Sequence, residues 1–158
     1  TSDNNTLWVE YPFLPGYDPG IPFRMDTSDF YRIRKEPISV VSEDTPWISA
    51  SALCGVRSQE LTLANDSEAR ETDYTIKLYF SELEDKKPGE RILNISIQGE
   101  EVLSNFDIVR ETGRTDKEII KSFPGIRAGK TLRLDLVPLT GNTIISGIEL
   151  IEEKTALK

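Results

Sequence analysis

The feature that most constrains the fold is a strict alternation of apolar and polar residues in the second half of the chain. Successive side chains of a β-strand point to opposite faces of a sheet, so a period of two predicts strands with one face on a core. Three segments have this period, and their apolar members are Tyr74, Ile76, Leu78 and Phe80, then Leu93, Ile95 and Ile97, then Leu132, Leu134 and Leu136. Each segment is therefore expected to be an amphipathic strand.

Turn-forming residues separate these three segments. They lie at Lys87–Glu90, Gln98–Glu101 and Ala128–Lys130, each with a glycine. Short strands divided by turns at this spacing are typical of a β-meander or a β-sandwich. The pattern therefore predicts an all-β domain.

Three further segments are candidate strands. Thr143–Ile151 is largely apolar on both faces, which predicts a central strand covered on both sides. Val102–Ile108 is a second candidate. Lys117–Phe123 fits a strand or a short helix capped by Asp116.

The first half of the chain is broken by prolines, which excludes long helices there. Thr6–Tyr11, Ile38–Ser42 and Glu60–Leu63 are expected to form short strands. The segment Tyr11–Pro22, rich in proline and glycine, is expected to be an ordered loop.

The length of 158 residues fits one domain with a substantial core. We expect the domain to span residues 6–153, with a linker stub at 1–5 and a tail at 154–158. A start at Thr1, without an initiator methionine or a signal-like apolar stretch, is expected of a segment taken from a longer protein or of a processed product.

Composition excludes several functions. Histidine is absent, which excludes Ser-His-Asp and Cys-His catalysis and imidazole zinc sites. The net charge of −8, with both signs interspersed, gives no basic face, so nucleic acid is not expected as a partner. The apolar runs fall far short of the ~20 residues that cross a bilayer, so no membrane insertion is expected.

The single cysteine, Cys54, excludes an internal disulfide and a cysteine-based zinc site. It lies between Leu53 and Gly55, in the segment Trp47–Gly55, which contains no base and no clear positive environment. We expect it to be a small buried hydrophobic residue.

Carboxylates gather directly after the first alternating segment, at Glu82, Glu84 and Asp85. Two carboxylates across a cleft could hydrolyse a glycosidic bond, but the lysines that follow at once favour a solvated loop. A structural calcium site on Asp107, Asp116 or the Glu82 loop is conceivable, because hard cations bind clustered oxygens. No other cofactor is expected.

Aromatic side chains in loops could bind the CH-rich face of a sugar ring. Tyr17, between Gly16 and Asp18, and Tyr31 are the candidates for exposure. Trp8 and Trp47 are expected instead to plug one end of the domain.

Three short pieces, in this order, carry a family resemblance. They are Phe80-Ser81-Glu82 at the end of a strand, Gly89-Glu90-Arg91 leading into the next strand, and Phe106-Asp107-Ile108. Over roughly Asp73–Ile151 the chain resembles the malectin and malectin-like domains. The resemblance implies a jelly-roll, galactose-binding-like β-sandwich whose relatives bind oligosaccharides with loops at one end. In bacteria such domains often belong to large exported multidomain proteins.

The family's binding residues carry over only in part. An aromatic pair of the animal lectin falls on Glu84 and Asp85, so that stacking platform is absent. A ligand-contacting aspartate falls on Gly141, beside Asn142, whose amide could still bond a sugar hydroxyl.

These observations predict a single all-β domain that binds and does not catalyse. We expect a carbohydrate-binding module that holds an oligosaccharide through Tyr17, Tyr31, Glu84, Asp85 and Asn142. The alternative is a structural or protein-interaction module that contacts neighbouring domains and binds no sugar. The resemblance implies an extracytoplasmic location, periplasmic or on the cell surface.

Overall fold

The computed structural model describes residues 23–25, 30–64, 67 and 69–154. The first half of this chain forms β1 (Phe23–Met25), β2 (Tyr31–Arg34), the 3-10 turn η1 (Pro37–Ser39), α1 (Pro46–Ser49), β3 (Ser51–Cys54) and β4 (Ser58–Thr62). The second half forms β5 (Thr72–Ser81), β6 (Ile92–Ile97), β7 (Glu100–Phe106), α2 (Ile108–Thr112), β8 (Glu118–Ala128), β9 (Thr131–Thr140), β10 (Ile144–Ile145) and β11 (Gly147–Glu152).

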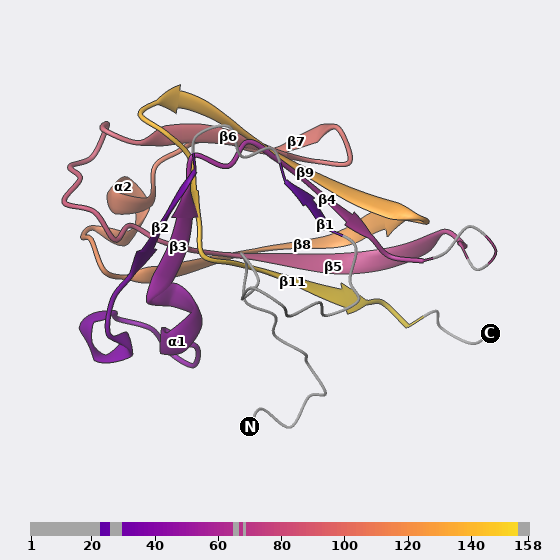
Figure 1. Cartoon of the computed structure of the whole chain (residues 1–158), viewed down its shortest axis with the longest axis horizontal. Coiled ribbons are helices and arrows are strands. Elements are labelled where there is room, and N and C mark those ends of the chain that lie inside the picture. Colours follow the sequence, from indigo (N-terminus) through magenta and orange to yellow (C-terminus); the bar gives the residue numbers. More distant parts are fainter. Residues whose placement is uncertain (1–22, 26–29, 65–66, 68, 155–158) are drawn as a thin grey trace.

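The strands form two layers (Figure 1). One layer is a five-stranded sheet in the order β1-β4-β9-β6-β7. The other contains β11-β5-β8, and β10-β3-β2 forms a small sheet at one end of it, beside α1. All strand pairs within these sheets are antiparallel. The predicted fold class, an all-β jelly-roll sandwich of one domain, is confirmed.

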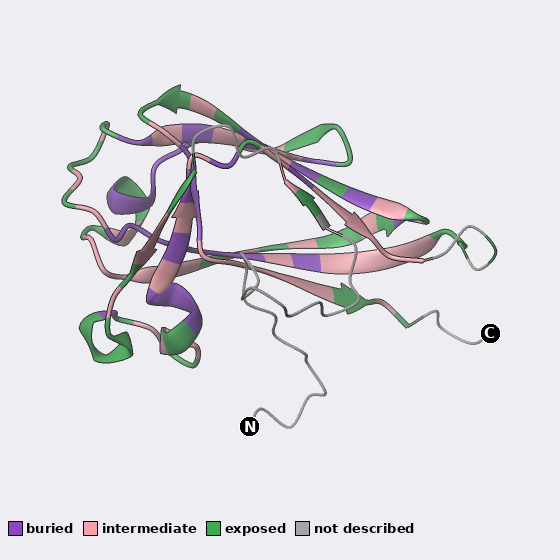
Figure 2. Cartoon of the chain, viewed as in Figure 1, coloured by how far each residue is buried: buried purple, intermediate pink, exposed green. Residues whose placement is uncertain are grey.

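The core lies between the layers and is built by the alternating segments. Ile76, Leu78 and Phe80 of β5 are at most 1% exposed, as are Leu93, Ile95 and Ile97 of β6. Figure 2 shows the alternation as bands of buried and half-buried residues along these strands. The apolar residues predicted from the period of two, including Leu132, Leu134 and Leu136 of β9, form one buried cluster, except Tyr74, which is partly buried and packs against it.

Several strand predictions hold with shifted limits. Glu60–Leu63 corresponds to β4, and Val102–Ile108 to β7, which ends at Phe106 because Asp107 caps α2. Lys117–Phe123 lies largely in β8, so the alternative of a helix capped by Asp116 is wrong. Pairing with β5 along nearly its whole length holds this segment extended.

Two strand predictions need correction. Ile38–Ser42 is not a strand, because Pro37 begins a 3-10 turn and only Val41 makes a bridge, to Lys117. Thr143–Ile151 is divided: β10 pairs with β3 and has both residues buried, while β11 pairs with β5 at a sheet edge of the described strands. Both strands thus lie at the edge of their sheets among the described strands, so the predicted central position is wrong, and the predicted burial holds for β10 alone. The predicted strand Thr6–Tyr11 and loop Tyr11–Pro22 lie outside the described residues.

The turn between β9 and β10 depends on Gly141. Its φ of +69° lies in the left-handed region, and a Cβ atom there would lie 2.6 Å from the carbonyl oxygen of Glu90. The loops that contain Asn142 and Arg91 can approach this closely only because position 141 has no side chain.

We therefore expect Gly141→Ala to lower the free energy of unfolding by several kcal/mol, on the order of 2–4, since strain and a backbone clash add. Gly125→Ala is the matched control, because Gly125 also has φ +69° but nothing lies within 4 Å of its added Cβ. It should cost about 1 kcal/mol. Urea unfolding of both variants measures the difference, and equal losses would contradict the close approach.

Candidate functional site

The three pieces of sequence that carry the family resemblance meet at one end of the sandwich. The rings of Phe80 and Phe106 pack edge to face with centroids 4.9 Å apart. The backbone N–H of Gly89 donates to Asp107 Oδ2 at 2.6 Å. Glu82, which follows β5, forms an ion pair with Arg91, which precedes β6. These contacts fix the path of the loop between the two strands.

Arg91 is the centre of the site although its side chain is only 2% exposed. Its Nε donates to Glu82 Oε2 at 2.7 Å, and its Nη2 donates to Glu82 Oε1 at 3.3 Å. Nη2 also bonds the carboxylate of Glu84. Nη1 donates to Asn142 Oδ1 at 2.6 Å and to the carbonyl oxygens of Asn142 and Thr143. One guanidinium therefore joins the loop after β5 to the loop before β10.

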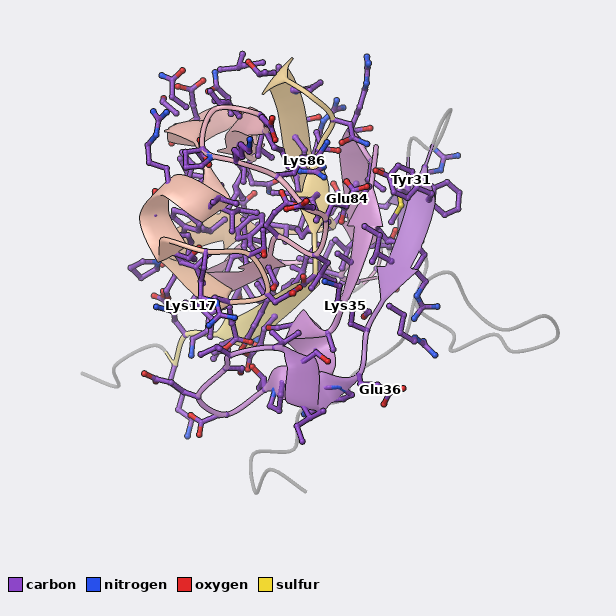
Figure 3. The ribbon with its side chains drawn as sticks, turned by 90° about the vertical axis from the view of Figure 1, so that its left-hand side faces the viewer. Tyr31, Lys35, Glu36, Glu84, Lys86 and Lys117 are labelled. Atoms are coloured by element: carbon purple, nitrogen blue, oxygen red, sulfur yellow. The ribbon has the colours of Figure 1, made fainter. Side chains whose placement is uncertain are left out.

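Tyr31 of β2 completes this network from the outside. Its hydroxyl lies 3.0 Å from both carboxylate oxygens of Glu84, and the Nδ2 of Asn142 donates to it at 3.3 Å. Tyr31 is 42% exposed and the Glu84 side chain is 31% exposed. Figure 3, which looks onto this end of the sandwich, shows Tyr31 and Glu84 beside each other.

The structure thus brings together three of the five residues predicted to bind a ligand, namely Tyr31, Glu84 and Asn142. Asp85 is exposed next to Glu84 and is not part of the network among the described residues. Tyr17 lies outside the described residues.

Arg91 and Glu82 were not predicted as part of the site. Glu82 was interpreted as a residue of a solvated loop, which is wrong, because its side chain is only 1% exposed. The Gly-x-Arg piece signalled Arg91, and a buried carboxylate needs a partner of this kind. What the sequence did not show is that the two side chains face each other across the loop.

Burial and neighbouring charges have opposite effects on the pKa values of Glu82 and Arg91. Burial raises the pKa of Glu82, and the nearby Arg91 charge opposes that shift. Burial alone would lower the pKa of Arg91, but Glu82 and the other negative groups outweigh it and raise that pKa. Partial burial also raises the pKa of Tyr31. At neutral pH the Tyr31 hydroxyl therefore keeps its proton for Glu84.

Cys54 is fully buried, as the sequence predicted. Burial raises the pKa of its thiol to about 11, although Arg91, contrary to expectation, supplies a positive charge that lowers it. Position 54 pairs with Tyr31 in the small sheet, so the thiol lies beneath the site.

Trp47 does not plug the end of the sandwich, contrary to expectation. It is 51% exposed, because its neighbours Ile48 and Ser49 are the residues of α1 that turn inward. Trp8 lies outside the described residues.

The carboxylates considered for calcium are held by three different partners. Asp107 caps α2 by accepting from the N–H of Arg110, Asp116 pairs with Lys35 at 2.6 Å, and Glu82 pairs with Arg91. Within the described part of the chain, no group of three or more Asp, Glu, His or Cys side chains is placed to hold a metal ion.

None of the described helices is long and apolar enough to cross a membrane.

The fold is thus a β-sandwich in which Tyr31 of β2 meets polar side chains from the loops after β5 and before β10 at one end. A sequence model of the Malectin domain matches residues 57–149, which is more than half of the chain. The chain belongs to the malectin domain family. No curated protein matches its sequence.

Solved structures share the fold at low sequence identity. A β-glucuronidase from Bacteroides uniformis has a TM-score of 0.66 at 16% identity, over 88% of this chain and 15% of that one. The ANX1 ectodomain from Arabidopsis thaliana has a TM-score of 0.67 at 13% identity, over 84% of this chain and 41% of that one. A chain in the complex of the plant peptide RALF23 with FER and LLG2 has a TM-score of 0.63 at 14% identity, over 79% of this chain and 39% of that one. The chain therefore spans less than half of each of these proteins.

Replacing Arg91 with methionine should leave Glu82 buried and unpaired, so we expect a loss of about 3–5 kcal/mol in the free energy of unfolding. Glu82→Gln tests the pair from the other side and should also destabilise. Arg127→Met removes an exposed arginine that pairs with Glu71 and Asp73, and should change stability little. Denaturant unfolding compares the three, and an Arg91 variant as stable as the Arg127 variant would contradict the buried pair.

The thiol of Cys54 should not react with iodoacetamide at pH 8 while the protein is folded. Its raised pKa leaves little thiolate, and burial blocks access. In 8 M urea one thiol per chain should be alkylated, as measured by mass spectrometry. Rapid labelling without denaturant would show that the site above Cys54 is open.

Proposed function

We propose that this domain is a non-catalytic carbohydrate-binding module that holds an oligosaccharide at the Tyr31 end of the sandwich. The observation that carries the proposal is the network in which buried Arg91 fixes Glu84 and Asn142 beside the half-exposed ring of Tyr31. Such a site offers an aromatic face together with polar groups of fixed orientation, which are the elements that sugar recognition needs.

Exposed groups around the network extend the proposed binding surface. Asp85 lies beside Glu84 and can accept hydrogen bonds from sugar hydroxyls. Tyr17 is also proposed to contact the sugar, on the basis of the sequence alone. Belonging to the malectin family supports a sugar as the ligand, while the missing aromatic pair at Glu84 and Asp85 means that this chain holds it differently.

The charges at the site argue against glycoside hydrolysis. A glycosidase needs one carboxyl group as a proton donor and another as a base or nucleophile, on opposite sides of the sugar. Glu82 and Glu84 are both paired with the same guanidinium, and Glu82 is buried under it. Neither is placed to protonate a leaving group.

We further propose that the domain, spanning residues 6–153, belongs to a larger exported, multidomain bacterial protein and works outside the cytoplasm. Two findings support this context. The fold occurs as 15% of a Bacteroides β-glucuronidase, and it occurs within plant ectodomains.

A protein-interaction module is the alternative, and one observation favours it. The segment between β2 and β3 exposes apolar side chains: Ile38 is 96% exposed, Trp47 51% and Val41 48%. A related fold occurs in a complex of a plant peptide with two proteins. In this alternative a neighbouring domain contacts the same end and no sugar binds.

Titration calorimetry against a panel of oligosaccharides tests the proposal. We expect binding in the range typical of weak lectin sites, and a loss on the order of tenfold in Glu84→Gln, because a carboxylate accepts stronger hydrogen bonds than an amide. Tyr31→Ala should weaken binding at least as much by removing the aromatic face.

Glu71→Gln is the matched control, since Glu71 is an exposed carboxylate paired with an arginine near the start of β5, far from Glu84. It should bind like the wild type. If the wild-type domain and its variants bind no oligosaccharide in a broad panel, the carbohydrate proposal is wrong and the interaction module takes its place.

A further inference from the structure

The hydroxyl of Tyr31 has the hydrogen bonds that a ligand hydroxyl would have. It donates to the Glu84 carboxylate and accepts from the Asn142 amide. A sugar hydroxyl is likewise a donor and an acceptor at once, so it can make the same pair of bonds. The position between Glu84 and Asn142 is thus already filled from within the chain.

The two partners of this hydroxyl are fixed before any ligand arrives. Arg91 bonds Glu84 through Nη2 and Asn142 through Nη1, and its side chain is only 2% exposed. Glu84 and Asn142 therefore keep their places if the tyrosine hydroxyl leaves. A site fixed in this way loses little entropy when it binds.

Tyr31 is the member of the network that can move. It is the most exposed member, at 42%, and it lies on β2, a four-residue strand at the edge of the small sheet. It also lies outside residues 57–149, the part that matches the family, whereas the other members lie inside it. Rotation of one side chain toward solvent would expose Glu84 and Asn142.

Resting on the proposed function, we propose that Tyr31 is a specificity-determining residue whose hydroxyl competes with the ligand for Glu84 and Asn142. A ligand binds there when one of its hydroxyls replaces the tyrosine hydroxyl and restores both hydrogen bonds. Sugars that present no hydroxyl at this point leave the carboxylate with Tyr31 and bind weakly. Removal of the tyrosine hydroxyl therefore strengthens binding.

The test compares Tyr31→Phe, Tyr79→Phe and the wild-type domain by calorimetry with maltose, cellobiose and laminaribiose. Tyr31→Phe keeps the ring and deletes only the competing hydroxyl. Tyr79→Phe is the matched control, because the hydroxyl of Tyr79 also bonds a carboxylate, that of Glu149, at 2.6 Å. Thermal melting checks that both variants are folded.

We expect Tyr31→Phe to bind at least one of these disaccharides on the order of tenfold more tightly than the wild type, with Tyr79→Phe unchanged. Binding seen only in Tyr31→Phe would support the inference equally. If the wild type binds and Tyr31→Phe binds equally or more weakly, the competition is refuted while the proposed function stands. If the wild type and both variants bind none of these disaccharides and nothing in the broad panel, the competition and the proposed carbohydrate-binding function are both wrong.

Discussion

The buried ion pair between Arg91 and Glu82 is the interaction on which this end of the molecule depends. Two charges taken out of water are tolerated only when their hydrogen-bonding groups are satisfied, and here the guanidinium bonds two carboxylates, an amide and two backbone carbonyls. Such a pair adds little net stability, but loss of one partner is severe. It therefore fixes geometry more than it stabilises the fold.

The ion pair fixes the relative position of two loops at this end of the sandwich. The loop after β5 and the turn before β10 meet at the guanidinium, and the missing side chain at Gly141 lets them approach. The polar groups that face solvent, on Glu84 and Asn142, are thus oriented from below. A binding surface made of loops gains in this way the rigidity that loops lack on their own.

The sequence predicts those features of the fold that a local pattern of residues determines. Alternation around Ile76, Leu93 and Leu134 identified the core strands, because a period of two is written within each strand. The split of Thr143–Ile151 was missed, since two neighbouring strands decide it and both of its faces are apolar. Glu82 was misplaced for a similar reason: the lysines beside it in sequence suggested solvent, while its partner lies across the loop. The contact of Tyr31 with Glu84 joins residues 53 apart, which no local period reveals.

The central claim is that Arg91 is buried and held by Glu82, and the exchange of its Nε–H proton with water tests it most directly. In an NMR spectrum at neutral pH, the account predicts a resolved Arg91 Nε–H signal that exchanges slowly, beside rapidly exchanging signals of exposed arginines such as Arg127. Glu82→Gln should speed its exchange. An Arg91 signal lost to exchange as fast as that of Arg127 would contradict the account.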